Sequence, residues 1–197
     1  MTRRRLLVLA SGSPRRRVLL RREGFDFTVL RPDIDERPAD HEAPTEMVAR
    51  LSEMKATAGS AGSTPAAVVL GADTTVVRNG KALGKPRDSQ EAVEMLLSLS
   101  DRSHEAVTGY ALAVEGRVVD SGIESTTVVF GALDVDDAVA YAATGEPADK
   151  AGGYAIQGLG RQFVKEISGS FTNVMGLPME AIVPLLAKHG VNPTTGN

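Results

Sequence analysis

The stretch that most constrains this chain lies near its start, where an apolar run leads into a short hydroxyl-bearing turn and then a proline. Residues 6–9 have the apolar character of a strand, and residues 11–13 form the turn. Pro14 suits the first turn of a helix, with Ser13 as its expected N-cap. A strand, a tight turn and a helix N-terminus direct several backbone N–H groups at one place. This arrangement favours binding of an anion, above all a phosphate.

Three arginines, Arg15 to Arg17, fill the first turn of the helix expected over residues 14–22. A helix normally prefers acidic residues there, so the arginines have a local cost. Because a guanidinium binds phosphate oxygens through two parallel hydrogen bonds, Arg15 and Arg16 are candidates for holding a polyanionic ligand. The alternative, that the side chains face solvent, stays open for Arg16 and is favoured for Arg17.

The charge of the chain is unevenly distributed. The first 24 residues contain eight arginines and one glutamate, a net charge of +7, and the remainder carries −10. A basic segment can indicate nucleic-acid binding. However, the chain has no tryptophan, few aromatic residues and no recognisable nucleic-acid motif. A compact phosphate site explains the same charge, so no nucleic-acid partner is expected.

Length and composition place the chain among ordinary globular proteins. Its 197 residues suffice for one sizeable core, and we expect one domain over residues 1–190 and a disordered tail over 191–197. The chain has no cysteine, so disulfides and thiolate metal ligands are excluded. No apolar run approaches the roughly 18 to 20 residues of a membrane span. We therefore expect a cytoplasmic protein with no membrane partner.

An acidic loop bounded by prolines, residues 32–38, contains Asp35 and Glu36. Its carboxylates are either part of a solvated loop, which composition alone favours, or ligands of a hard cation. The next helix opens at Pro44, and its spacing predicts a buried stripe of Met47, Leu51, Met54 and Ala58. Lys55 is expected at the edge of that stripe. There it either extends along apolar surface to solvent or directs its ammonium into a site.

Residues 66–72 form a continuous apolar run, as expected for a central strand covered on both faces. The run ends in Asp73 and Thr74. An acid at the carboxyl end of a buried strand lies where open α/β sheets place ligand chemistry. Asn79-Gly80 predicts a hairpin turn, and Lys85 follows between a glycine and a proline.

The second half of the chain alternates between strand and helix signals. A β pattern extends from His104 to Phe130, and His104 is interpreted as structural rather than catalytic. Residues 152–160 are rich in glycine around Gln157, which indicates close approach of the backbone to a ligand. The sequence predicts an α/β fold.

Acidic and basic candidates together form an inventory for binding phosphate and a divalent metal. They are Asp35, Glu36, Asp73, Arg15, Lys55 and Lys85. Oxygen ligands without cysteine favour Mg²⁺ or Mn²⁺. The basic groups would neutralise charge on a pyrophosphate leaving group. The chain has neither a P-loop motif nor the Gly-x-Ser-x-Gly elbow of serine hydrolases.

Six motifs, in order along the chain, resemble those of the Maf family. They are Ser11-Gly12-Ser13-Pro14-Arg15-Arg16, Gly71-Ala72-Asp73-Thr74, Gly84-Lys85-Pro86, His104-Glu105-Ala106-Val107-Thr108-Gly109, the segment from Asp149 to Gly158, and Gly176-Leu177-Pro178. The resemblance implies a fold like that of inosine triphosphatases, with a central mixed twisted sheet flanked by helices and two lobes enclosing an active-site cleft. It also implies hydrolysis of the bond between the α- and β-phosphates of a nucleoside triphosphate with a divalent cation.

The resemblance also assigns roles to particular residues. Asp73 matches the proton acceptor of the family, which activates water or holds the metal together with Glu36. The other phosphate- and metal-site matches are Ser11, Arg15, Arg16, Lys55 and Lys85, and Ser13 belongs to the same substrate-binding turn. Substrate preference is implied to depend on Arg15, Thr74 and Gln157.

The identities at those three positions are similar to the branch of the family that acts on dTTP and UTP. A glutamine amide can pair with the O4 and N3–H groups of uracil or thymine. The alternatives are a 7-methyl-GTP pyrophosphatase and a nucleotide-binding regulator of septum formation. Family members are commonly dimers, and the sequence leaves a homodimer open.

Overall fold

The computed structural model describes residues 5–194 and divides the chain into two compact units. Unit 1 comprises Met1–Asp73, Thr108–Glu124 and Gly176–Asn197, and unit 2 comprises Thr74–Val107 and Ser125–Met175. The boundary between Asp73 and Thr74 falls inside one strand.

The strands belong to one seven-stranded sheet in the order β2-β1-β3-β5-β6-β7, with β4 paired to β3. They are β1 (Leu7–Ala10), β2 (Phe27–Leu30), β3 (Val68–Arg78), β4 (Lys81–Leu83), β5 (Ser103–Val114), β6 (Arg117–Phe130) and β7 (Val164–Ser168). The α-helices are α1 (Pro14–Arg22), α2 (Pro44–Ala61), α3 (Ser89–Leu99), α4 (Val135–Ala143), α5 (Phe171–Val174) and α6 (Met179–Lys188). Short 3₁₀ helices are η1 (Glu146–Asp149), η2 (Ala151–Gly153) and η3 (Leu159–Phe163). The sheet is mixed, because β1 pairs in parallel with β2 and β3 whereas β6 and β7 are antiparallel. The predicted α/β class with a mixed sheet flanked by helices is confirmed.

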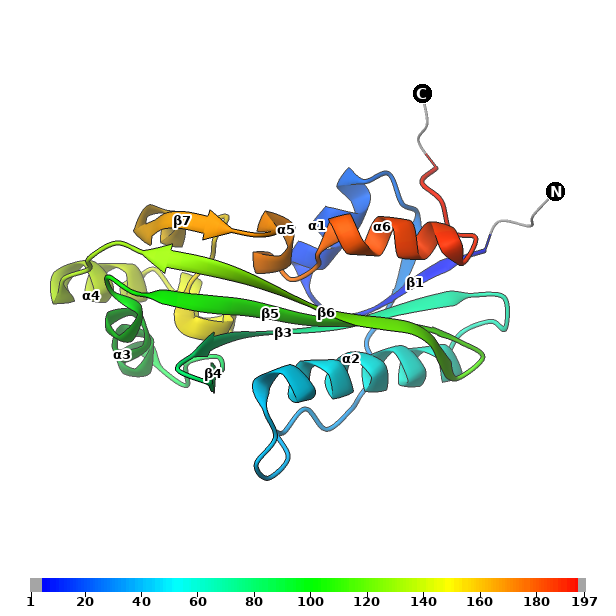
Figure 1. Ribbon diagram of the computed structural model, residues 1–197, viewed down its shortest axis with the longest axis horizontal. Coiled ribbons are helices and arrows are strands. Elements are labelled where there is room, and N and C mark those ends of the chain that lie inside the picture. The colour runs from blue at the N-terminus through cyan, green and yellow to red at the C-terminus, as the bar shows by residue number, and fades with distance from the viewer. Residues whose placement is uncertain (1–4, 195–197) are drawn as a thin grey trace. The chain divides into compact units, whose positions relative to one another are not determined.

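In unit 1, α1 and α6 cover one face of the sheet and α2 covers the other (Figure 1). All four residues of β1 are buried, as the apolar run predicts. α1 begins at Pro14 with Ser13 as its N-cap, since the Ser13 hydroxyl accepts from the Arg16 N–H at 3.4 Å. This helix start is confirmed because it depends only on neighbouring residues.

α2 contacts the sheet backbone at two glycines of neighbouring strands. A Cβ atom on Gly71 of β3 would lie 2.3 Å from the carbonyl oxygen of Ser52, and one on Gly109 of β5 would lie 2.2 Å from that of Val48. Only glycine allows this approach. The two glycines therefore fix how closely α2 packs against the sheet.

Asp73 lies inside β3 and not at its end, which corrects the expectation that the strand stops at residue 72. The reason is that β3 continues to Arg78 and forms a hairpin with β4, whose turn has φ values of 49° at Asn79 and 74° at Gly80. The neighbouring strand β1 ends at Ala10, which pairs with Gly71. Asp73 thus lies two residues beyond the last paired residue of β1, and the turn after β1 begins at the same level.

The core of unit 2 contains a cluster of three rings. His104, Phe130 and Tyr154 pack edge to face with centroid separations of 4.8–5.4 Å. The His104 Nε2 atom is 2.8 Å from the Tyr154 hydroxyl, and burial lowers the pKa of His104 to about 4. The histidine is therefore neutral in the folded protein at neutral pH, in keeping with a structural role.

The C-terminal segment is held by hydrogen bonds as far as it is described. Val191 is buried and donates to the carbonyl of Leu186, and Thr194 donates to that of Gly24. Val191 and Thr194, which belong to the tail expected over 191–197, are thus hydrogen-bonded to Leu186 and Gly24. Residues 195–197 lie outside the described part.

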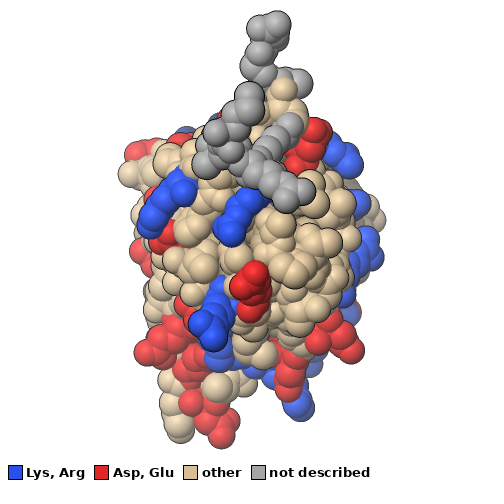
Figure 2. Space-filling model, turned by 90° about the vertical axis from the view of Figure 1, so that its right-hand side faces the viewer, with Lys and Arg blue, Asp and Glu red and all other residues tan. Residues whose placement is uncertain are grey.

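Charged side chains of both signs are interspersed among neutral ones on the face shown in Figure 2. Within residues 5–194, no helix is both long and apolar enough to cross a membrane.

Replacing Gly109 by alanine is expected to lower the free energy of unfolding by about 1–3 kcal/mol, because the added methyl would force α2 away from the sheet. Urea unfolding followed by circular dichroism measures the change. Gly84→Ala is the control, since a Cβ there meets nothing within 4 Å. Equal stability of the two variants would contradict the tight contact between α2 and β5.

His104 should also make stability depend on pH. Its pKa falls from 6.5 to about 4 on folding, so the unfolded chain binds the proton more readily. Stability is then full above pH 6.5 and is lost as the pH falls toward 4, by about 2 kcal/mol between pH 7 and pH 5. His104→Phe should remove this component of the urea-unfolding profile, and His41→Asn, at an exposed position with φ of 60°, should retain it. An unchanged profile in His104→Phe would assign the effect to another group.

Candidate functional site

Two carboxylates and an ammonium group meet at the face of β3 that α2 covers. The Nζ atom of Lys55 lies 2.7 Å from Oδ1 of Asp73 and 2.9 Å from Oε1 of Glu36. The Asp73 side chain is 15% exposed and that of Glu36 is 56% exposed. The contact with Asp73 is therefore the desolvated half of the cluster, and the contact with Glu36 is the solvated half.

The close packing of α2 explains why Lys55 reaches Asp73. Gly71 and Asp73 are two residues apart on β3, so they project from the same face of the sheet. On the helix, Ser52 and Ala56 contact Gly71, and Lys55 lies between them in the sequence. The Lys55 ammonium is therefore placed beside Asp73, which follows Gly71 on the same face of β3.

The buried stripe of α2 differs from the predicted one. Met47, Met54 and Ala58 are only half-buried. The buried residues are Val48, Leu51, Ser52, Lys55, Ala56, Gly59 and Ser60. Where α2 contacts the sheet, several of the buried residues are small, such as Ser52, Ala56 and Gly59. A prediction from the hydrophobic pattern alone therefore assigns the wrong face of α2 to the core. Lys55 consequently lies within the buried face and not at its edge.

The loop over residues 31–43, which carries Glu36, is attached to α2 by Arg50. The guanidinium of Arg50 makes two hydrogen bonds to Glu42, of 2.5 and 2.7 Å, and a third to the carbonyl of Arg37 at 3.2 Å. The hydrogen bonds from Arg50 lower the pKa of Glu42 to about 2. The sequence did not reveal the role of Arg50. Its partner Glu42 lies eight residues away and before the start of α2, so the pair does not have the three- or four-residue spacing of side chains that meet on a helix. Asp35 pairs with Arg37 in the same loop and does not join Lys55 among the described contacts.

Arg16 is buried and connects three separate segments of unit 1. Its Nη1 atom donates to the Ser11 hydroxyl at 3.1 Å and to the Ala72 carbonyl at 2.8 Å, and its Nε donates to the Gly176 carbonyl at 2.8 Å. Burial lowers the pKa of Arg16, and the nearby charge of Asp73 opposes that shift. The guanidinium thus joins the turn after β1 to the residue before Asp73 and to the chain before α6.

This geometry distinguishes the two arginines proposed for anion binding. At least three hydrogen-bond donations by Arg16 go to protein oxygens, whereas Arg15 lies half-buried in the first turn of α1. The Ser11 hydroxyl also accepts from the Ser13 N–H at 3.1 Å, which closes the turn. In the sequence, Gly176 stands out only as part of the Gly176-Leu177-Pro178 motif. Its contribution is the backbone carbonyl that accepts from Arg16, which no pattern of side chains could reveal.

The remaining candidates belong to unit 2. Thr74 follows Asp73 on β3, Lys85 is exposed after β4, and Gln157 is exposed in a turn before η3. The Gly152 N–H donates to the Gly84 carbonyl at 3.0 Å. The glycine-rich segment therefore contacts the residue before Lys85, within the same unit.

The chemistry of the cluster fits a hard divalent cation. Glu36 and Asp73 present carboxylate oxygens to one ammonium position, and Mg²⁺ sites commonly use one or two carboxylates together with substrate phosphates. No group of three or more acidic, histidine or cysteine side chains within residues 5–194 could hold a metal by itself. A cation bound by these residues would need ligands from substrate or water.

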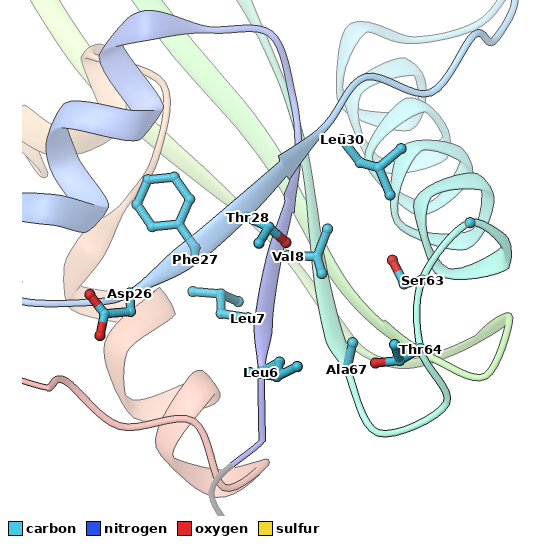
Figure 3. A pocket seen from close by; sticks show the side chains of 11 residues that line it. Leu6, Leu7, Val8, Asp26, Phe27, Thr28, Leu30, Ser63, Thr64 and Ala67 are labelled. Atoms are coloured by element: carbon cyan, nitrogen blue, oxygen red, sulfur yellow. The ribbon is translucent and has the colours of Figure 1, made fainter.

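An apolar cavity of about 430 Å³ opens in unit 1 beside β1 and β2 (Figure 3). Side chains such as Leu6, Val8, Phe27 and Leu30 line it, and among the described lining residues Asp26 is the charged one. None of these described lining residues belongs to the cluster of Lys55, Asp73 and Glu36, so the cavity is separate from that cluster.

Arg16→Lys is expected to lower the free energy of unfolding by about 1–3 kcal/mol, since one ammonium cannot replace the planar guanidinium toward three acceptors. Urea unfolding measures the loss. Arg22→Lys, an exposed change on the same helix, is the control. If the two variants are equally stable, Arg16 does not hold these segments together.

A family model and several known proteins match this chain over nearly its whole length. The family model described as "Maf-like protein" matches residues 6–189. A protein of Vibrio cholerae named "dTTP/UTP pyrophosphatase" is 47% identical over 92% of this chain and 97% of its own length. Proteins with the same name from Symbiobacterium thermophilum and Myxococcus xanthus are 46% and 49% identical, covering 96% and 94% of this chain and 97% and 93% of their own lengths.

A solved structure titled as a nucleoside-triphosphatase / dITP/XTP pyrophosphatase from Mycobacterium abscessus has a TM-score of 0.44 and 17% identity over 93% of both chains, a likeness too weak to carry an argument. The family match spans all but the two ends of the chain, and the relatives cover nearly all of it. This chain belongs to the Maf family.

Proposed function

We propose that this protein hydrolyses dTTP and UTP between the α- and β-phosphates, releasing the nucleoside monophosphate and pyrophosphate. The observation that carries the proposal is the Lys55 ammonium held between Asp73 and Glu36, beside a turn fixed by Arg16. The names of relatives that are 46–49% identical support the same reaction and substrates.

Asp73 is the proton acceptor in this proposal. The oxygen of a water molecule attacks a phosphorus atom, and a proton of that water passes to the Asp73 carboxylate. The bond from this phosphorus to the oxygen that bridges the α- and β-phosphates breaks, which releases the monophosphate and pyrophosphate. Lys55 fixes the orientation of the carboxylate through the 2.7 Å contact. Arg16 fixes the preceding carbonyl, so the backbone on the N-terminal side of the base is held.

Binding of the triphosphate falls to the basic residues and to the turn after β1. Ser11 and Ser13 shape the turn, and Arg15 lies in the first helical turn, where the positive end of the helix dipole favours anions. Lys85 is assigned to the neutralisation of charge on the pyrophosphate leaving group, as the resemblance of its motif to the family implies. Arg16 contributes mainly by positioning, because its donors bind protein carbonyls and the Ser11 hydroxyl.

Glu36 and Asp73 would hold a Mg²⁺ or Mn²⁺ ion. When bound, such an ion neutralises charge on the phosphate oxygens. Lys55 holds a positive charge between the same two carboxylates, so it keeps their repulsion low before a cation arrives.

Gln157, Thr74 and Arg15 are assigned to recognition of the base. A primary amide offers a donor and an acceptor side by side, which matches the O4 acceptor and N3–H donor of uracil and thymine. The exposure of Gln157 in its turn is compatible with this role. We infer a cytoplasmic location from the substrate, because that compartment holds the nucleotide pool.

The experiment that tests the proposal measures pyrophosphate release with Mg²⁺ or Mn²⁺ from dTTP, UTP, CTP, ATP, GTP and 7-methyl-GTP. Fast release from dTTP and UTP is expected. Asp73→Asn should lower kcat about 10²–10⁴-fold, the range for loss of a positioned base, while nucleotide binding persists. Asp40→Asn, an exposed change in the loop before α2, is the control.

Two results would overturn parts of the proposal. Activity confined to 7-methyl-GTP would retain the reaction and reject the pyrimidine preference. Nucleotide binding without hydrolysis of any substrate would favour a regulatory protein instead.

A further inference from the structure

The turn that carries Gln157 is unusually well held for an exposed segment. The turn comprises Ala155 to Leu159, and within it the Gly158 N–H donates to the Ala155 carbonyl at 3.2 Å. Residues 152–156 are buried, whereas Gln157 to Leu159 are exposed. Only the tip of the turn is thus available to a ligand, and its two ends are set by the surrounding protein.

Two side chains from α4 and η1 bind both ends of this turn. The Tyr141 hydroxyl accepts from the Ala155 N–H at 3.1 Å and donates to Oε1 of Glu146 at 3.2 Å. The other Glu146 oxygen, Oε2, accepts from the Leu159 N–H at 2.9 Å. A continuous hydrogen-bonded path therefore runs from one end of the turn through Tyr141 and Glu146 to the other end.

Glycines make this close fit possible. A Cβ atom on Gly158 would lie 2.0 Å from Oε1 of Glu146, and one on Gly160 would lie 2.7 Å from the Tyr141 hydroxyl. A side chain at position 158 would require the Glu146 carboxylate to shift, and one at position 160 would collide with the Tyr141 hydroxyl and the backbone of Ala155. Tyr141 is 3% exposed, so the hydroxyl makes these contacts inside the protein, where hydrogen bonds are costly to lose.

A second contact holds the segment just before the turn. Tyr154 is buried, and its hydroxyl lies 2.8 Å from Nε2 of His104. Residues 154, 155 and 159 are therefore each held by a side chain from another element, and all belong to unit 2. Gln157 lies in the exposed part of the segment, between the residues that these contacts hold.

We propose that Tyr141 and Glu146 are positioning residues for base selection, because they fix the backbone that presents the Gln157 amide. The inference rests on the proposed pyrimidine triphosphatase function. Uracil offers an acceptor at O4 and a donor at N3, whereas cytosine offers a donor at N4 and an acceptor at N3. A fixed backbone places the Gln157 side chain at one distance and angle from the base edge, where its amide can pair with O4 and N3–H of uracil, and a mobile turn weakens that pairing.

Tyr141→Phe removes the hydroxyl and keeps the ring. The kcat/KM ratio of UTP to CTP is expected to fall about tenfold, the order of effect of one net hydrogen bond. The loss should come from a higher KM for UTP with kcat nearly unchanged. Glu146→Ala, at a half-buried position, should produce the same fall without emptying a core site.

Tyr110→Phe is the matched control, because it removes a hydroxyl in unit 1, whereas the turn belongs to unit 2. Its UTP to CTP ratio should equal that of the unmodified protein. In a Gln157→Ala background, Tyr141→Phe should change the ratio no further, since the reading group is already gone. Equilibrium binding of UTP and CTP to the same variants gives the ratio independently of turnover.

The outcomes separate the two proposals. A protein that binds UTP in preference to CTP but hydrolyses neither would reject the proposed reaction, and its binding ratio would still test the positioning role. A Tyr141→Phe variant with the unmodified ratio would overturn the inference alone. So would an equal fall in the Gln157→Ala background, because the effect would then not pass through Gln157.

Discussion

The backbone contact between α2 and the sheet is the constraint on which the candidate site depends. Gly71 and Gly109 have no side chain, so the helix backbone lies directly on β3 and β5. That contact fixes the height and rotation of α2, and Lys55 then reaches the carboxylate two residues beyond Gly71. A looser helix would leave Asp73 without its ammonium partner at 2.7 Å.

Two buried cations stabilise the site in different ways. Arg16 uses its planar group to bind two carbonyls and a hydroxyl, which joins segments more than 50 residues apart in the chain. The contacts of the Lys55 ammonium within residues 5–194 are to the carboxylate oxygens of Asp73 and Glu36. Burying a charge is costly unless its hydrogen-bonding groups are satisfied. The Arg16 guanidinium is therefore held in place by these three protein acceptors. The lysine shares ligands that a divalent cation could also use.

Local features of the sequence were predicted well. The start of α1 and the Asn79-Gly80 hairpin are confirmed, because each depends on residues within a few positions. The predictions of the buried face of α2 and of the end of β3 were wrong. Both depend on what packs against the element, and glycines that permit backbone contact have little weight in a hydrophobic pattern.

The sequence by itself determined the class of fold, the family and the identity of the chemical groups, since these follow from periodicity and motifs. Tertiary structure decided which groups meet. It placed Lys55 between Asp73 and Glu36, committed Arg16 to protein carbonyls, and tied the ends of the Gln157 turn to Tyr141 and Glu146. The physical reason is that these contacts join residues from separate elements, many of them far apart in the chain. Their geometry depends on packing that no local spacing encodes.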